Sequence, residues 1–212
     1  MKIVILNSDP NHPINPHLER LTSELVKRHQ VEVVRTASKI SGGQILFLVS
    51  CNVKVSQSIL DKFEHCLVLH ASDLPKGRGW SPHVWELINR NSEITVTMLE
   101  ARDRIDTGDI YAKKTIKIPR LALWDEINSL LFSAEIDMMK FAVDNYQKLA
   151  RVPQNPEITP TYYRKRTPAD SKLDISKSIS EQFDLIRVCD PNRFPAYFEI
   201  GAVKYKLTLE KI

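Results

Sequence analysis

The chain has 212 residues, 42% of them hydrophobic and 26% charged, which is typical of a globular protein with one α/β domain and room for a small appendage. Its longest apolar runs, such as residues 45–49, are too short to cross a bilayer, and no leader-like segment precedes the first strand, so we expect a cytoplasmic protein without a membrane partner. The formal net charge of +4 suits an anionic ligand, but the basic residues are interspersed with acidic ones, which does not support a nucleic-acid partner.

The first half of the chain alternates apolar strands with helical segments. Residues 2–7 (KIVILN) are typical of a buried strand, and Asn15-Pro16 predicts a helix with Asn15 as its N-cap. Residues 27–29 (KRH) would lie at the end of that helix, where its dipole favours cations. Further strands are expected at residues 31–36, 44–51, 66–71, 93–101 and 109–118, and further helices around residues 56–63 and from Ser81-Pro82.

This alternation predicts an α/β fold with a doubly wound, mostly parallel sheet. A long helix should cover residues 123–150, and residues 151–160, with three prolines, should form a surface linker. The tail predicts a helix around residues 176–188 and a hairpin of residues 196–200 and 204–211. We therefore divide the chain into a domain of residues 1–150 and an extension of residues 151–212. The free edge of the hairpin leaves a homodimer open.

Two polar segments lie where an open α/β sheet binds ligands, at the carboxyl ends of its strands. Residues 70–82 (HASDLPKGRGWSP) combine His70 with two glycines and two cations just before a helix, and residues 103–109 (DRIDTGD) form the second segment. A histidine and a carboxylate are the minimum for acid–base work near neutral pH. From these residues alone, such a histidine is more often one merely hydrogen-bonded at a strand end, and the second segment is more often a simple turn. The three cysteines, Cys51, Cys66 and Cys189, lack metal-ligand spacing and suggest reduced thiols, with a nucleophilic Cys51 as the alternative.

The order and spacing of HASDLPKGRGWSP and RIDTGDI, separated by a helix and a strand, resemble the core of the folate-dependent formyltransferase family. That family includes glycinamide ribonucleotide transformylase, methionyl-tRNA formyltransferase and the sugar N-formyltransferases, and its Rossmann-like fold agrees with the predicted sheet. The tail segments at residues 161–174, 181–183 (EQF) and 194–198 (FPAYF) resemble the sugar N-formyltransferases in particular. The resemblance covers residues 45–118 best.

The resemblance implies a formyl transfer from 10-formyl-tetrahydrofolate to a primary amine, without a metal. His70 would donate to the developing oxyanion and move protons, and Asp106 would orient His70 and accept the proton of the amine, through water. The family has an asparagine two positions before this histidine, whereas Val68 stands there in this chain. Asn52, after the preceding strand, is the expected substitute. The alternatives are that Asn52 only caps a helix or satisfies a turn, or that the enzyme is slow or inactive.

The resemblance also maps the two ligand sites onto loops. The folate would lie between the loop after the third strand and the loop before the catalytic aspartate, held largely by backbone groups. The corresponding residues are Cys51, Asn52, Val53, Lys54, Glu100, Arg102, Asp103, Ile105 and Asp106. The acceptor would be bound by the loop after the first strand and by the glycine-arginine loop, at Asp9, Asn11, Lys76, Gly77, Arg78, Gly79 and Trp80.

The loop after the first strand reads NSDPNHPINP, with three prolines and no glycine, so it disfavours the phosphate nest that glycinamide ribonucleotide would need. A tRNA acceptor is also disfavoured, because no dense basic strip and no barrel domain is seen. We therefore expect a nucleotide-linked amino sugar, as used in surface polysaccharides. A carrier-bound aminoacyl group, or a non-catalytic homologue that binds folate or a sugar nucleotide, are the alternatives.

Overall fold

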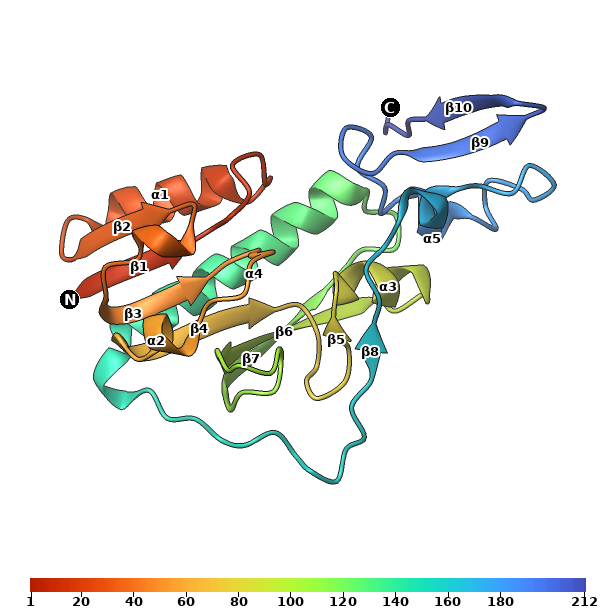
Figure 1. Ribbon diagram of the computed structural model, residues 1–212. Helices are drawn as coiled ribbons and strands as arrows, with labels where there is room; N and C mark the ends of the chain where they lie inside the picture. Colours follow the sequence, from red (N-terminus) through yellow and green to blue (C-terminus); the bar gives the residue numbers. More distant parts are fainter.

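The computed structural model describes residues 1–212 and is built on a six-stranded sheet of order β2-β1-β3-β4-β6-β7 (Figure 1). The strands β1, β2, β3 and β4 are mutually parallel, whereas β6 runs antiparallel to both β4 and β7. The expected α/β sheet is therefore confirmed, with its parallel half at the N-terminal end of the chain. The bounds are Lys2–Leu6 (β1), Gln30–Val34 (β2), Gly43–Leu48 (β3), Phe63–His70 (β4), Glu93–Glu100 (β6) and Ile110–Lys117 (β7).

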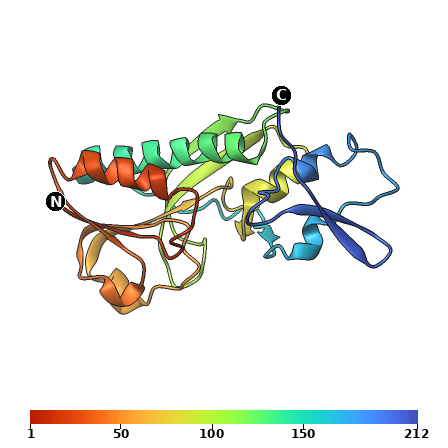
Figure 2. The ribbon, with the colours of Figure 1, turned by 90° about the horizontal axis from the view of Figure 1, so that it is seen from above.

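Helices cover both faces of this sheet, which explains why its central strands are almost continuously apolar. The helices α1 (Asn15–Leu25) and α4 (Trp124–Asp144) lie side by side on one face, and η1 (Ala37–Lys39) and α2 (Gln57–Leu60) lie on the other (Figure 2). Along β1, Ile3 and Ile5 belong to the larger core, under α1 and α4, and the alternating Val4 and Leu6 belong to the smaller core of 8 residues. The helix α3 (Pro82–Ile88) follows the loop after β4.

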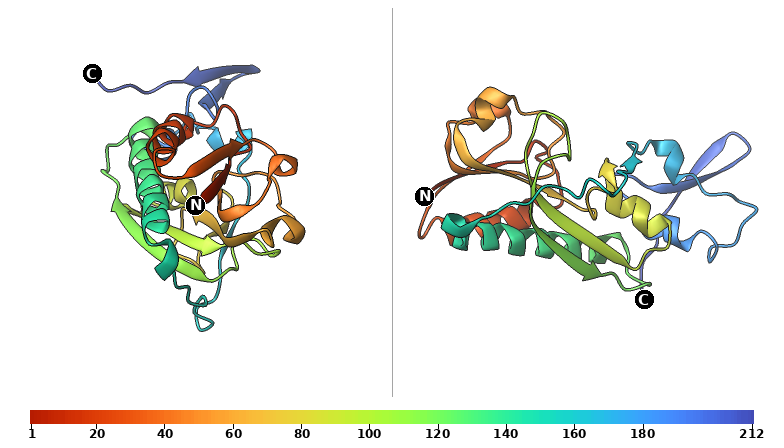
Figure 3. Two further views of the ribbon diagram at one scale, coloured as in Figure 1. Left: turned by 90° about the vertical axis from the view of Figure 1, so that its left-hand side faces the viewer. Right: turned by 90° about the horizontal axis from the view of Figure 1, so that it is seen from below.

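The chain after α4 and η2 (Tyr146–Lys148) runs back to the sheet before it forms the extension (Figures 1 and 3). Two short strands join there, because β8 (Tyr162–Tyr163) pairs in parallel with β5 (Arg78–Gly79). The extension then forms η3 (Pro168–Ser171), α5 (Phe183–Ile186) and a hairpin of β9 (Ala196–Ile200) and β10 (Val203–Leu207) around a small core of four buried residues. A domain boundary at residue 150 stays a prediction.

Three of the expected local features are wrong. The helix expected at residues 176–188 is reduced to the four residues of α5, because the preceding polar side chains bond locally: Asp174 accepts from the backbone and hydroxyl of Ser176, and Glu181 does the same for Ser178. Asn15 is not an N-cap. It is the first residue of α1, and its amide instead donates to the carbonyls of Asp9 and Pro10. Residues 27–29 lie beyond the end of α1, so they do not form its last turn.

Candidate active site

His70 is the last residue of β4 and lies at the carboxyl end of the parallel part of the sheet. It is 8% exposed, and its Nε2 lies 2.8 Å from the carbonyl oxygen of Gly77 in the following loop. A carbonyl oxygen only accepts hydrogen bonds, so Nε2 carries a proton and donates it to Gly77. In the neutral imidazole, the lone pair therefore lies on Nδ1.

Asp106 faces that Nδ1 from the turn between β6 and β7. Its Oδ1 is 3.6 Å from Nδ1 of His70, and its Oδ2 accepts a hydrogen bond of 2.8 Å from the backbone N–H of Gly79. The carboxylate side chain is 6% exposed, and the residue has a left-handed backbone with φ of 57°. A separation of 3.6 Å is too long for a direct hydrogen bond. The two groups therefore face each other at ion-pair distance, and neither Nδ1 nor Oδ1 makes a direct hydrogen bond to the other.

Tight backbone contacts hold the loop between these two residues. Gly77 and Gly79 have φ values of 72° and 99°, which side chains rarely adopt. A Cβ on Gly79 would lie 2.3 Å from the carbonyl oxygen of Tyr163 in β8. On the other side of the loop, the ammonium group of Lys113 donates to the Leu74 carbonyl and pairs with the Asp73 carboxylate. The loop is thus fixed by β8 and by β7.

The two loops expected to hold folate approach each other. The Lys54 ammonium and the Asp103 carboxylate form an ion pair of 2.5 Å between them. Beside this bridge, Val53 is 46% exposed and Ile105 is 66% exposed, so each loop presents an apolar side chain to solvent, next to the sheet edge that carries Asp106. Unpartnered apolar side chains on two linked loops fit the faces of a flat heteroaromatic ligand such as a pterin.

The other side chains expected at the folate loops are engaged with the protein. Glu100 pairs with Arg151 and Arg102, and Arg102 also bonds to Asp109. The Cys51 thiol donates to the carbonyl of Leu6 at 3.0 Å, and burial raises its pKa to about 11. Cys51 is therefore a protonated thiol at neutral pH, which argues against a nucleophilic role.

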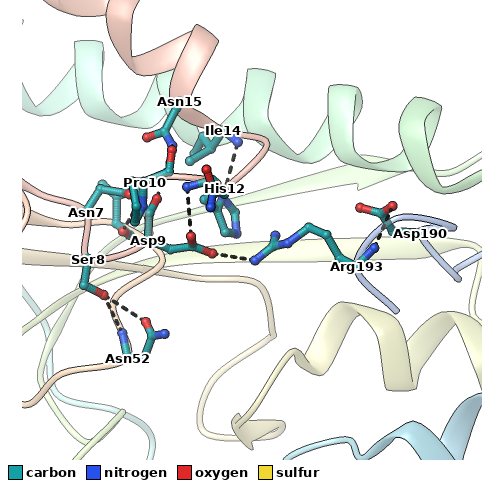
Figure 4. Close-up of polar contacts among 12 residues, drawn as sticks. Asn7, Ser8, Asp9, Pro10, His12, Ile14, Asn15, Asn52, Asp190 and Arg193 are labelled. Atoms are coloured by element: carbon teal, nitrogen blue, oxygen red, sulfur yellow. Dashed lines mark hydrogen bonds and ion pairs between the residues drawn. The ribbon is translucent and has the colours of Figure 1, made fainter. Parts of the chain in front are cut away.

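The loop after β1 contacts both Asn52 and the extension (Figure 4). Asn52 accepts from the Ser8 hydroxyl through Oδ1 at 2.8 Å, and its backbone N–H donates to the same hydroxyl oxygen at 3.0 Å. These bonds leave the Asn52 amide N–H groups free at an exposed position. Asp9 accepts from the backbone N–H of Asn11 and forms an ion pair with Arg193 of the extension. The expected acceptor loop is thus tied directly to the tail.

The glycine-arginine loop presents its side chains in two directions. Lys76 and Trp80 are exposed, and the Lys165 ammonium lies 4.7 Å from the Trp80 ring centroid. Arg78, in contrast, is 7% exposed and donates to Gln154 at 2.6 Å and to the Tyr162 hydroxyl at 3.1 Å. Its guanidinium is therefore held by protein acceptors, although Arg78 was expected to bind the acceptor substrate.

No sequence pattern pointed to Gln154, Tyr162 or Arg193. Gln154 lies in the segment expected to be a surface linker, and its amide donates to the backbone carbonyls of Asp106 and Gly108 at 2.9 Å each. Its only sequence signal is a glutamine next to a proline shortly before the aromatic pair of β8. Arg193 precedes the FPAYF segment, and nothing local indicates that it reaches Asp9, 184 positions away.

The segment that carries this geometry matches a known protein family. Residues 43–139, which hold His70 and Asp106, match the model of the formyl transferase family. Among curated relatives, the methionyl-tRNA formyltransferase of Agathobacter rectalis is 32% identical over 178 residues, 79% of this chain and 54% of that protein. The predicted resemblance to the folate-dependent formyltransferases is confirmed. The chain spans between about a third and about half of the length of the curated formyltransferases it matches.

Solved structures show the same formyltransferase fold. A methionyl-tRNA formyltransferase from Clostridium thermocellum superposes with a TM-score of 0.80 at 19% identity, covering 96% of this chain and 90% of the other. A 4-N formyltransferase from Francisella tularensis gives 0.77 at 18% identity, covering 100% of this chain and 98% of the other. HypX from Aquifex aeolicus, solved in complex with tetrahydrofolic acid, gives 0.78 at 19% identity over 94% of this chain and 36% of the other.

Two features of this formyltransferase fold concern membranes and metals. None of its helices has the length and apolar character needed to span a bilayer. No three side chains of His, Cys, Asp or Glu are grouped as they would be around a metal ion.

Proposed function

We propose that the protein is an N-formyltransferase that moves a formyl group from 10-formyl-tetrahydrofolate to the primary amine of a nucleotide-linked amino sugar. The observation that carries the proposal is the buried His70–Asp106 pair at the carboxyl end of β4, with each side chain held by the backbone of the loop between them. Such a pair provides acid–base chemistry where the sheet binds ligands.

The formyl donor would lie between the loops that carry Val53 and Ile105, and it would supply an activated acyl group. His70 and Asp106 would then act on the incoming amine. Asp106, whose Oδ1 is free of protein hydrogen bonds, would receive the proton that the amine loses, directly or through water. A protonated His70 would donate to the oxygen on which negative charge develops, since its Nδ1 makes no hydrogen bond to the protein. When the tetrahedral intermediate collapses, the bond from the formyl carbon to N10 of the folate would break, and the proton held by Asp106 would pass to N10, which leaves tetrahydrofolate and the formylated amine.

Asn52 would supply a second donor to that oxygen, in place of the amide that Val68 lacks. Its Oδ1 is bound by Ser8, which orients the side chain so that the N–H groups face away from this contact. The free donors of Asn52 support this role. Ser8 thus positions Asn52 in the proposal, and its removal should weaken the effect of Asn52 without abolishing it.

The amino-sugar acceptor is supported by the extent of the match to proteins of that class. A sugar N-formyltransferase from Shewanella sp FDAARGOS_354 and this chain cover each other almost completely, 100% of this chain and 99% of the other, including the extension and its hairpin. The exposed Trp80, beside Lys165 and Lys76, offers an aromatic face and positive charge for a sugar nucleotide. We propose that the reaction takes place in the cytoplasm and contributes to the biosynthesis of surface polysaccharides.

A second candidate acceptor is an aminoacyl group, either on tRNA or on a carrier protein. The observation that favours it is that the curated relatives are methionyl-tRNA formyltransferases. The same His70–Asp106 chemistry would serve, because an aminoacyl group also presents a primary amine. The two candidates differ in what surrounds the amine, so acceptor preference separates them.

The test is a mass-based assay of formyl transfer from 10-formyl-tetrahydrofolate. The purified protein is offered amino-sugar nucleotides with uridine or thymidine, methionyl-tRNA, and an aminoacyl carrier protein in parallel. We expect a mass gain of one formyl group on an amino-sugar nucleotide, and its loss in His70→Ala and Asp106→Asn. Asp137→Asn on the exposed face of α4 is the matched control and should retain the wild-type rate.

Each outcome decides between the candidates. Transfer only to methionyl-tRNA or to the carrier would refute the sugar acceptor and retain the formyltransferase. Folate binding without transfer to any amine would indicate a non-catalytic homologue. A normal rate in Asn52→Ala would reject the substitute role of Asn52.

A further inference from the structure

Residues 151–161 do more than connect α4 to the extension. Val152 forms an antiparallel bridge with Ile110 of β7, with N–H to carbonyl distances of 2.7 and 2.9 Å. This bridge brings the segment alongside the Asp106 turn and places Gln154 two residues further along. A segment with three prolines and little regular structure is thus anchored at the functional edge of the sheet.

Gln154 connects the two catalytic segments. Its Nε2 donates to the carbonyls of Asp106 and Gly108, both at 2.9 Å, and its Oε1 accepts from Arg78 at 2.6 Å. The guanidinium has only donors, so Oε1 must face Arg78 and the two N–H bonds of Gln154 must face the carbonyls. Arg78 therefore fixes the orientation of the Gln154 amide.

Arg78 is suited to this structural task. It is 7% exposed and forms no ion pair, and its other amino group donates to the Tyr162 hydroxyl. A buried guanidinium that binds neutral acceptors is costly unless those acceptors are correctly placed. The Gln154 amide and the Tyr162 hydroxyl consequently have to occupy their observed positions.

The Asp106 turn needs support of this kind. Asp106 has a left-handed backbone, which a residue with a side chain adopts only when its surroundings impose it. Gln154 holds the carbonyl on one side of the residue, and the Gly79 N–H holds its carboxylate. Because Gly79 follows Arg78 directly, the chain Arg78–Gln154–Asp106 closes a ring of contacts that sets the distance between Asp106 and His70.

We propose that Gln154 is a positioning residue for formyl transfer, and that Arg78 acts through it rather than on the acceptor. The expected effect on kcat rests on the proposed function. The expected effect on the position of Asp106 rests only on the contacts of that residue. Gln154 touches no reacting atom. It sets the backbone from which the Asp106 carboxylate extends toward His70.

The test compares Gln154→Glu with Gln30→Glu, an equal charge change at an exposed position of β2. Gln154→Glu keeps the size and the contact with Arg78, but it loses both N–H donors. We expect kcat to fall 10- to 100-fold with KM for donor and acceptor within threefold. The added negative charge should also raise the apparent pKa of the acid limb of the kcat profile. Gln154→Asn, which keeps the amide on a shorter chain, serves if Gln154→Glu does not fold.

Hydrogen exchange of the Gly79 amide provides a readout that needs no activity. That N–H donates to Asp106, so its exchange should be at least tenfold faster in Gln154→Glu and unchanged in Gln30→Glu. Wild-type Gly79 protection with wild-type kcat in Gln154→Glu would overturn the inference. Absence of transfer by the wild-type protein would refute the proposed function, and the Gly79 exchange would still decide whether Gln154 sets the Asp106 geometry.

Discussion

Substitution of Gly79 by alanine tests whether the contact between β5 and β8 maintains the catalytic geometry. An alanine Cβ would lie 2.3 Å from the Tyr163 carbonyl oxygen, and a φ of 99° adds roughly 1–3 kcal/mol of backbone strain. Relieving the contact requires a shift that breaks the bond from the Trp80 N–H to Tyr163, worth about 1 kcal/mol. We expect the free energy of unfolding to fall by roughly 2–4 kcal/mol in total.

Activity should fall as well, because the Gly79 N–H donates to the Asp106 carboxylate. A hydrogen bond to a charged group is worth about 1.5–3 kcal/mol, which corresponds to roughly a 10- to 150-fold loss in kcat/KM. Urea unfolding and the formyl-transfer assay measure the two effects. Gly201→Ala is the control, since Gly201 also has a positive φ, of 60°, but its Cβ would meet no atom within 4 Å. Equal destabilisation in both variants would refute the steric argument.

Three further predictions concern buried and bridging groups. Burial raises the pKa of Glu135 to about 8, so its ionisation opposes folding increasingly as pH rises from the unfolded value near 4.5 toward 8. Glu135→Gln should therefore gain about 4 kcal/mol of unfolding free energy at pH 8, measured by urea titration, and almost nothing at pH 4.5; equal gains at both would contradict this. Cys51→Ala should keep kcat within threefold, and the wild-type Cys51 thiol should react slowly with a maleimide at pH 7; a catalytic loss above 100-fold would restore the nucleophile. A double-mutant cycle of Asp9→Ala and Arg193→Ala should give a coupling energy of about 1 kcal/mol, since both side chains are partly exposed. Burial, and then the charge of Arg193, lower the pKa of His12 to about 4, so Arg193→Ala should raise that pKa in an NMR titration.

The sequence predicted the sheet because its strands follow from local patterns, whereas the roles of His70 and Asp106 were implied only by the resemblance to the formyltransferases. Apolar runs bounded by polar loops give the strands, and His70 stands at the end of one of them. The turn at Asp106 follows the next long strand, β6, which pairs directly with β4. Strand pairing therefore brings the two polar segments together, whatever the details of the loops.

The contacts within the site join residues that are far apart in the sequence, so no local pattern predicts them. The strands β5 and β8 have two residues each, too few for any periodicity, and they are separated by more than 80 positions. The orientation of Arg78 is set by Gln154, 76 positions away, so its charge and its place beside two glycines suggested a ligand contact instead. Asn15 failed as a cap because its Oδ1, the atom that would cap a helix, accepts a hydrogen bond from Arg35, 20 positions away, while its amide N–H groups donate to carbonyls of the preceding loop.

These long-range contacts also bear on the division of the chain into a domain and an extension. The first 150 residues contain the whole central sheet, yet the backbone of the catalytic loop is completed by residues beyond that point. Thr161 accepts from the Gly77 N–H through its hydroxyl and from the Arg78 N–H through its carbonyl, while Tyr163 accepts from Trp80. The carbonyl of Gly77, which holds His70, thus lies on a segment whose position is set from the extension. The proposed catalytic site therefore depends on residues up to Tyr163, and we expect a cut at residue 150 to keep the strands of the sheet while it removes the partners of the loop that contacts His70 and Asp106.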